Sequence, residues 1–204
     1  MTGRYAQVAF TPGVREQQRR HGSLRGYQRM ADVPAVADRI GPDEAWFLGE
    51  RDSFYLATVG ETGWPYIQHR GGPRGFLKVI DSGTIGFADF RGNRQYISRG
   101  NLDHDDRVAL FLMDYAAQTR MKLFGRAEVV EAQDDPDLMA KMSVAGYRAH
   151  VERAVLITVE AFDWNCRQHI PELYPRAEVA EALQSLRDRI DELERENARL
   201  RSGK

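Results

Sequence analysis

Two short segments of the sequence combine glycine with arginine, the residue types that bind anions. His69–Gly75 contains Arg70 and Arg74, and Asp89–Gln95 contains Arg94. Glycine lets backbone N–H groups approach an anion closely, and a guanidinium can hold a phosphate through two parallel hydrogen bonds. Two such segments within one run of short strands predict a pocket for a phosphorylated ligand.

The elements that must position these segments are strands separated by short turns. The stretches are apolar, rich in β-branched and aromatic residues, and separated by glycine-containing turns such as Gly60–Gly63 and Asp81–Gly83. The predicted strands are Phe54–Val59, Trp64–His69, Phe76–Ile80, Thr84–Phe87, Arg107–Tyr115, Met121–Val130 and Ala154–Phe162. The sequence therefore predicts a β-meander that carries both cationic segments.

Helices are predicted where a capping residue or a proline stands at the start of a polar-apolar pattern. One begins at Pro12, capped by Thr11 and ended by Gly22, and is expected to pack on the sheet as a solvated helix. The alternative is that an arginine of this N-terminal segment closes over a bound anion. Further helices are expected from Pro42 and from Asp134 to about His150.

The segment Asn93–Asn101 is predicted to be a short helix, with Asn93 as its cap and with Tyr96 and Ile97 facing inward. A helix that starts at the second cationic segment would aim its free N–H groups at a phosphate. Arginine and helix start would then act on the same anion.

The order of these elements resembles the pyridoxamine 5′-phosphate oxidase-like flavoproteins, the FMN-binding split barrels, over roughly Pro42 to Ile170. The resemblance is carried by Phe54–Val59, Phe76–Lys78, Gly86–Phe87, Gly92–Gln95 and Arg107–Phe111, and by Gly125, which would end a strand that begins at Met121. Two segments differ from the family. Gly71, Gly72, Pro73 and Gly75 lengthen the stretch after Arg70, and Asn93-Arg94-Gln95 stands where the oxidases carry Ser-Arg-Lys.

The resemblance implies that the ligand is FMN and assigns roles to residues of the two segments. Arg70, Arg74, Lys78 and Arg94, next to His69, would neutralise the phosphate. Asp89, Asn93 and Gln95 would bind the ribityl chain or the adjacent backbone, and Arg120 would contact the isoalloxazine. The protein would hold the flavin while the flavin carries the electrons. No catalytic residue is identified.

The segment after the last strand is dense in polar and aromatic side chains. In the resembled family, residues at this place reach the flavin of the partner subunit, which implies a homodimer with the flavin at the subunit interface. Trp164, Gln168 and His169 are the candidates for that contact. The alternative is a packed aromatic corner with a hydrogen-bonded His169, and Cys166 is expected to be an ordinary buried thiol.

The last thirty residues have a heptad pattern that predicts a parallel, two-stranded coiled coil. Residues 183, 190 and 197 occupy the a positions, and residues 186, 193 and 200 occupy the d positions. Arg189 would face Glu194 of the partner helix, Glu196 would face Arg201, and Asn197 favours a parallel pair in register. The alternative is an amphipathic helix folded back onto its own subunit.

Bulk composition restricts the other function classes. The formal charge is −1, from 29 basic and 30 acidic residues, which argues against a nucleic-acid binder. No apolar run approaches the roughly 20 residues of a membrane span, and a single cysteine in a chain without a signal peptide favours the cytoplasm. The histidines and cysteine form no metal-binding pattern, and nucleotide-binding and nucleophile-elbow motifs are absent.

The expected fold is mainly β, in the α+β class: a split β-barrel with flanking helices and a C-terminal coiled-coil helix. We expect an N-terminal helical extension over residues 1–41, a flavin-binding barrel over 42–174 and the coiled-coil helix over 175–204. The expected function is FMN-dependent oxidation or reduction of a small molecule, with a small-molecule electron donor. The alternatives are a flavin carrier or sensor without turnover, and a related barrel that binds F420 or haem.

Overall fold

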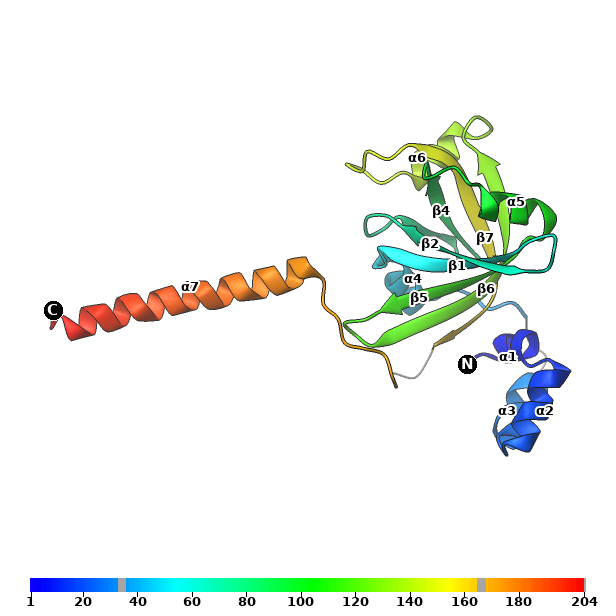
Figure 1. Ribbon diagram of the computed structural model, residues 1–204, viewed down its shortest axis with the longest axis horizontal. Helices are drawn as coiled ribbons and strands as arrows, with labels where there is room; N and C mark the ends of the chain where they lie inside the picture. The colour runs from blue at the N-terminus through cyan, green and yellow to red at the C-terminus, as the bar shows by residue number, and fades with distance from the viewer. Residues whose placement is uncertain (33–35, 165–167, 204) are drawn as a thin grey trace. The chain divides into compact units, whose positions relative to one another are not determined.

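The computed structural model describes residues 1–32, 36–164 and 168–203 (Figure 1). The helices are α1 (Gly3–Ala9), α2 (Pro12–Arg20), α3 (Leu24–Asp32), α4 (Pro42–Gly49), α5 (Ile97–His104), α6 (Pro136–Met142) and α7 (Arg176–Arg201). The strands are β1 (Ser53–Val59), β2 (Pro65–Gly71), β3 (Leu77–Asp81), β4 (Thr84–Phe90), β5 (Arg107–Asp114), β6 (Thr119–Glu131) and β7 (Val151–Trp164). The chain is thus α+β, with seven described strands and a long C-terminal helix.

All seven strands form one antiparallel sheet in the order β2-β1-β5-β6-β7-β4-β3. Alternate residues of β1, β5 and β6 point to the core, as the period of two requires. Leu56 of β1, Leu110 of β5, Leu123 of β6 and Ile157 of β7 are all essentially inaccessible to solvent. The sheet curls around this core, because a side chain of β2 reaches one of β4 although four strands separate them in the sheet order.

Gly125 lies inside β6 and does not end a strand, so the expectation drawn from the family pattern is wrong here. The register of β6 against β7 shifts between Phe124 and Gly125. A Cβ at Gly125 would lie 2.5 Å from Cγ2 of Ile157 and 2.7 Å from the carbonyl oxygen of Thr158. The bulge brings two backbones too close for any side chain, and β6 continues beyond it.

Helix α5 begins four residues later than predicted. Arg94 and Tyr96 have φ angles of 61° and 53°, in the left-handed region, so a right-handed helix cannot include them. Asn93 does not cap the helix. Its Oδ1 accepts a hydrogen bond from the backbone N–H of Gln95 instead. Tyr96 and Ile97, expected to face inward, are 41% and 40% exposed.

Helix α6 begins as predicted and ends early. Asp135 caps it by accepting a hydrogen bond from the backbone N–H of Leu138, and Pro136 occupies the first turn. Ser143 then takes an extended conformation, and Gly146 has a φ of 80°. These two backbone conformations end the helix at Met142, well before His150.

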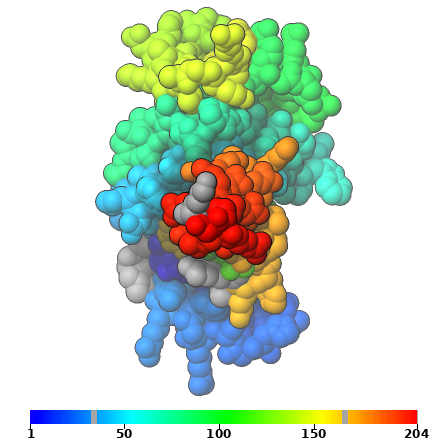
Figure 2. Space-filling model, turned by 90° about the vertical axis from the view of Figure 1, so that its left-hand side faces the viewer, coloured from blue at the N-terminus to red at the C-terminus, as the bar shows by residue number. Residues whose placement is uncertain are grey.

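The N-terminal helices attach to the sheet through α1. Helix α2 does begin at Pro12, and Thr11 caps it by accepting from the N–H of Val14. No residue of α2 is buried, and in Figure 2 side chains of the N-terminal helices, in blue, project into solvent. The packing comes from Tyr5 of α1, whose ring stacks on Phe124 of β6. Helix α2 was expected to pack on the sheet, but α1 makes that contact.

The chain divides into two compact units by its internal contacts. One comprises residues 1–114 and 119–168, and the other comprises residues 115–118 and 169–204. In the second unit, the side-chain amide of Gln118 donates to the carbonyl oxygen of Ile170 at 2.7 Å. Helix α7 belongs to this unit and has no buried residue.

Candidate functional site

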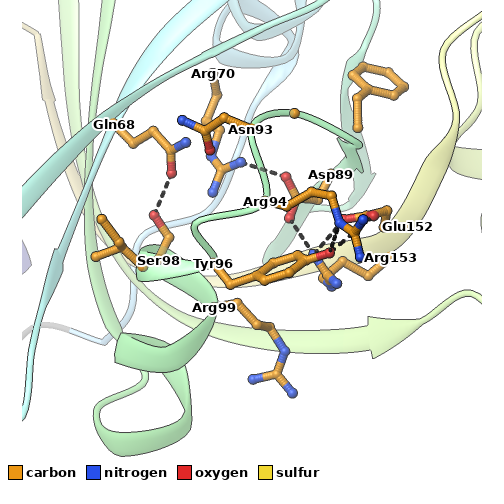
Figure 3. A pocket seen from close by; sticks show the side chains of 13 residues that line it. Gln68, Arg70, Asp89, Asn93, Arg94, Tyr96, Ser98, Arg99, Glu152 and Arg153 are labelled. Atoms are coloured by element: carbon orange, nitrogen blue, oxygen red, sulfur yellow. Dashed lines mark hydrogen bonds and ion pairs between the residues drawn. The ribbon is translucent and has the colours of Figure 1, made fainter.

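A charged cleft of about 200 Å³ opens where β2 approaches β4 and β7 (Figure 3). It is lined from β2, from β4, from the loop after β4, from the start of α5 and from β7. The lining residues are Gln68, Arg70, Asp89, Phe90, Gly92, Asn93, Arg94, Tyr96, Ile97, Ser98, Arg99, Glu152 and Arg153. The cleft therefore joins five parts of the chain that the sequence keeps up to 85 residues apart.

A row of alternating charges crosses the sheet under this cleft. Asp89 of β4 stands directly opposite Arg153 of β7, and Arg153 stands opposite Glu131 of β6. Nη1 of Arg153 lies 3.1 Å from Oδ2 of Asp89, and its Nε lies 3.2 Å from Oε2 of Glu131. Arg70 pairs with Asp89 at one end, and Arg99 pairs with Glu131 at the other. Each carboxylate thus lies between two guanidinium groups.

Two side-chain contacts close the opening between the sheet edges. Arg70 of β2 donates from Nη1 to Oδ1 of Asp89 on β4. Ser98, at the start of α5, donates to Oε1 of Gln68 on β2 at 2.8 Å. Strand β2 has β1 as its hydrogen-bonded neighbour, so these contacts supply its link to the other side of the barrel. Closure and the cleft therefore depend on the same residues.

Arg70 has one buried N–H without a hydrogen-bond partner in the described chain. Its Nε is buried and has no hydrogen-bond partner among the described residues. In Figure 3 its guanidinium lies between the side chains of Gln68 and Asp89. A buried guanidinium N–H without an acceptor is costly, so an acceptor in the cleft would stabilise it. The planar fork of arginine matches phosphate or carboxylate oxygens.

The loop between β4 and α5 turns its side chains back over the row of charges. Tyr96 donates from its hydroxyl to Oε1 of Glu152 at 3.3 Å, and Arg94 donates to that same hydroxyl at 3.3 Å. The Tyr96 ring lies 5.2 Å from the guanidinium of Arg153. The two positive φ angles of this loop are costly for non-glycine residues, and such conformations cluster at ligand-binding loops.

The electrostatics of the cleft favour an anion. The lining residues include four arginines and two carboxylates, a surplus of two positive charges. A hydrogen bond from Arg91, with smaller contributions from Arg153 and Tyr96, lowers the pKa of Glu152. Burial works against the charge of Arg153, but the contacts with Asp89 and Glu131 outweigh it and raise the pKa of Arg153. Glu152 and Arg153 therefore both stay ionised near neutral pH.

Four of the residues predicted for the site line this cleft: Arg70, Asp89, Asn93 and Arg94. An adjoining hollow of about 170 Å³ shares Arg70 and Asp89 and is also lined by His69. His69 precedes Arg70 in β2 and faces the other side of the sheet, where its ring lies 5.7 Å from that of Tyr55.

Other predicted site residues lie outside the cleft lining. Arg74 is exposed and contacts Glu50 at 3.5 Å. Lys78 lies on β3, opposite Gly86 of β4. Gln95 is exposed and donates its backbone N–H to Asn93. The guanidinium of Arg120, on β6, lies 5.6 Å from the centre of the Phe111 ring.

The residues predicted to contact a partner's flavin are placed as follows. Trp164 ends β7, donates from its indole N–H to Oε1 of Glu44 at 3.1 Å, and packs edge-on against Phe47. Gln168 is exposed, and His169, also exposed, has a φ of 63°. Cys166 lies outside the described residues.

Sequence reasoning missed the part of the cleft that comes from β7 and α5, and one lining residue of β2. Gln68, Ser98, Arg99, Glu152 and Arg153 were not among the candidates. One signal was present for Arg153. Residues 153, 155, 157 and 159 share one face of a strand, and the last three are buried and apolar. An arginine at the start of such a face needs a partner inside the protein.

A larger hollow of about 420 Å³ lies on the outer face of the sheet beside α1. Apolar residues such as Ala57, Ala109 and Phe124 form its floor, and Arg4, Arg107 and Glu160 belong to its rim. Within the described ranges, no group of three or more histidine, cysteine or carboxylate side chains is arranged to hold a metal ion. No helix in the described part of the chain is both long and apolar enough to cross a membrane.

Solved structures with a similar fold include HupZ from Group A Streptococcus, which is 18% identical and aligns over 66% of this chain and 99% of HupZ with a TM-score of 0.49. General stress protein 26 from Bacillus anthracis is 13% identical over 60% of this chain and 91% of its own, with a TM-score of 0.46. An F420 reductase is 20% identical over 60% and 98%, with a TM-score of 0.42. Likenesses this distant do not show what this chain binds.

The family profile is more decisive. No curated protein matches the sequence. The sequence profile of the family described as pyridoxamine 5′-phosphate oxidase matches residues 43–166, more than half of the chain. That span contains the seven described strands and the lining of the charged cleft. The chain therefore belongs to the pyridoxamine 5′-phosphate oxidase family.

Proposed function

We propose that this protein binds FMN, with the phosphate in the charged cleft, and that it is an FMN-dependent oxidoreductase acting on a small molecule. The observation that carries the proposal is the buried Nε–H of Arg70, which lacks an acceptor among the residues described, beside a cleft with two surplus positive charges. A phosphate monoester carries close to two negative charges near pH 7, so it matches that surplus. Membership of a family that typically binds FMN supports the same ligand.

The chain's own residues bind and orient the ligand in this proposal. Nε of Arg70 donates to a phosphate oxygen while Nη1 stays on Asp89, which fixes the guanidinium. Arg94 adds a second, exposed cation on the adjoining loop, and Asn93 offers an amide to the ribityl hydroxyls. The cleft is smaller than the roughly 300–1,000 Å³ of most small-molecule sites, so it accommodates only the polar end of FMN. When bound, the flavin supplies the redox chemistry.

Two proposals about a partner follow from surfaces of the separate units. The outer face of the sheet exposes Tyr55 and Ile67 by 42% and 65%, next to the half-buried Phe111 and Phe124. We propose that a second copy of the chain covers this face and completes the flavin site, with Trp164, Gln168 and His169 near the junction. An apolar patch flanked by polar residues is typical of such an interface.

The second proposed contact between copies is α7. Its heptad residues Leu183, Leu186, Ile190 and Leu193 are 41–61% exposed, so the apolar stripe has no partner within the described chain. The predicted cross-helix pairs, Arg189 with Glu194 and Glu196 with Arg201, are attractive only in a parallel pair. We propose that α7 pairs with α7 of a second copy and reinforces the dimer.

Purification and titration test the proposed ligand. We expect the protein to purify with a flavin spectrum, or to take up FMN when it is added. Arg70→Met removes a charge-assisted contact, so the Kd for FMN rises about tenfold or more. Arg74→Met is the matched control, because Arg74 does not line the cleft. An F420 or haem spectrum, or equal effects of the two substitutions, would overturn the assignment.

Turnover is tested separately from binding. With FMN bound, anaerobic mixing with NADH or NADPH is expected to bleach the flavin spectrum, and a small-molecule acceptor is expected to restore it. A protein that binds FMN tightly and is reduced by neither donor is a carrier or sensor, and the oxidoreductase part of the proposal fails.

A further inference from the structure

Arg153 occupies the centre of the charged row, at a place that no binding motif predicted. Its side chain is 10% exposed, and it contacts carboxylates on both neighbouring strands. It also approaches Glu152 at 3.4 Å and lies under the ring of Tyr96. One guanidinium thus fixes β4, β6 and the loop that covers the cleft.

The contact with Asp89 controls how Arg70 presents its donors. Oδ1 of Asp89 accepts from Nη1 of Arg70, and Oδ2 accepts from Nη1 of Arg153. Arg153 occupies the second oxygen, Asp89 holds Arg70 through one N–H of Nη1, and Nε of Arg70 has no acceptor in the described part of the chain. Without Arg153, Asp89 would be free to turn and to accept from Nε and Nη2 of Arg70 together, in the bidentate geometry that carboxylates prefer. The donor edge offered to a ligand would then be blocked.

The net charge of the cleft also leads us to expect weaker anion binding without Arg153. Removing Arg153 halves the surplus of two positive charges among the lining residues. It leaves Asp89 as a less compensated carboxylate next to the place where the phosphate would bind. A like charge in a partly buried cleft opposes the binding of an anion and has little effect on a neutral ligand.

We propose that Arg153 is a positioning residue that makes the cleft selective for a phosphorylated flavin, by holding Asp89 so that Arg70 presents a free donor edge. This inference rests on the proposed FMN site. It assigns to β7 a part in ligand selection that does not depend on contact between Arg153 and the ligand.

The substitution Arg153→Met is expected to fold, because every carboxylate that it leaves keeps another arginine. Asp89 keeps Arg70, Glu131 keeps Arg99, and Glu152 keeps Arg91. Methionine also preserves most of the apolar length of the side chain. The substitution therefore tests the effect of the guanidinium group of Arg153, its charge and its hydrogen bonds, separately from its packing.

The test compares FMN with riboflavin, which lacks the phosphate, in the full-length protein. For Arg153→Met we expect the Kd for FMN to rise about tenfold while that for riboflavin changes less than about twofold. The double variant Asp89→Asn/Arg153→Met also removes the negative charge of Asp89 and is expected to recover most of the affinity for FMN. Arg20→Met removes an arginine from exposed α2 and is expected to change neither Kd.

The outcomes separate this inference from the proposed function. If the wild type does not prefer FMN to riboflavin, the proposed phosphate site is wrong. If the wild type prefers FMN but Arg153→Met weakens both ligands equally, weakens neither, or is not rescued by Asp89→Asn, the role of Arg153 is wrong. If Arg153→Met does not fold, Arg153→Gln, which also removes the charge, decides by the same comparison: a loss specific to FMN supports the role, and an equal loss or no loss overturns it.

Discussion

The charged cleft and helix α7 both contain arginine–carboxylate pairs, which are mostly buried in the cleft and exposed on the helix. In the cleft, Arg70, Asp89 and Arg153 have side chains 10–15% exposed and are held by bonds across three strands. On α7, Arg189 and Glu192 are each 61% exposed and pair along one helix. Exposed pairs contribute little and re-form with other partners, whereas buried pairs fix one geometry. The pairs of the cleft can therefore hold a ligand in one orientation, whereas the pairs on α7 do not fix one geometry.

The largest expected effect is in the cleft. Asp89→Leu leaves Arg70 and Arg153 without the carboxylate that they share. Removing one member of a buried pair destabilises by about 3–5 kcal/mol, and the lower end applies because Arg153 keeps Glu131. Urea denaturation at a fixed protein concentration measures this loss. A loss below about 1 kcal/mol, the range of exposed pairs, would show that the two regions do not differ.

The second effect concerns the two proposed contacts between copies. A chain that ends at Pro175 is expected to remain dimeric and to bind FMN, with a lower Tm, because the sheet face still pairs. Ile67→Lys places a charge on that face, and Val36→Lys, at an 87% exposed residue elsewhere, is its control. Sedimentation is expected to show monomer only when Ile67→Lys and the truncation are combined. A monomeric or unfolded truncated chain would contradict this account of α7.

The third effect is a pH dependence that comes from the rim of the cleft. The pKa of Glu152 is lower in the folded protein than its unfolded value of 4.5. The ionised carboxylate therefore stabilises the fold above pH 4.5, and this stabilisation is lost as the pH falls through the folded-state pKa. Arg91, the main cause, is 53% exposed, so Arg91→Met is expected to cost only about 0.2–1 kcal/mol at neutral pH. The unfolding free energies of the two proteins should converge as the pH falls below 4.5. A difference in unfolding free energy that grows as the pH falls would contradict this prediction.

The smallest effect is expected on α7. Arg189→Glu would face Glu194 in a parallel pair and repel it, which weakens pairing by about 0.2–1 kcal/mol. The charge exchange Arg189→Glu/Glu194→Arg restores an attractive pair and should recover the Tm. If the exchange recovers nothing, the helices do not pair in the predicted register.

The parts of the fold that the sequence predicted depend on local patterns. The seven strands follow from the alternation of apolar residues, and Thr11 and Asp135 cap helices in the way that their types imply. The start of α5 could not be predicted, because the positive φ angles of Arg94 and Tyr96 occur at residues that rarely adopt them. The bulge at Gly125 likewise depends on the close approach of β7, which is a tertiary contact.

Only some of the residues that line the cleft could be predicted, for the same reason. Arg70 and Arg94 stand beside glycines and form a recognisable anion-binding pattern in the sequence. Arg153 and Ser98 enter only through the strand order, which places β7 beside β4 and the start of α5 beside β2. The role of such a residue depends on which distant strands pair. Its neighbours in the sequence therefore do not reveal that role, apart from the unexpected charge on an apolar strand face.

A crystal structure of the full-length protein with FMN tests the central claim most directly. We expect the phosphate within hydrogen-bonding distance of Nε of Arg70, with Asp89 still bridging Arg70 and Arg153. A phosphate in the apolar hollow beside α1, or a structure in which Arg70 still donates only to Asp89, would contradict the account.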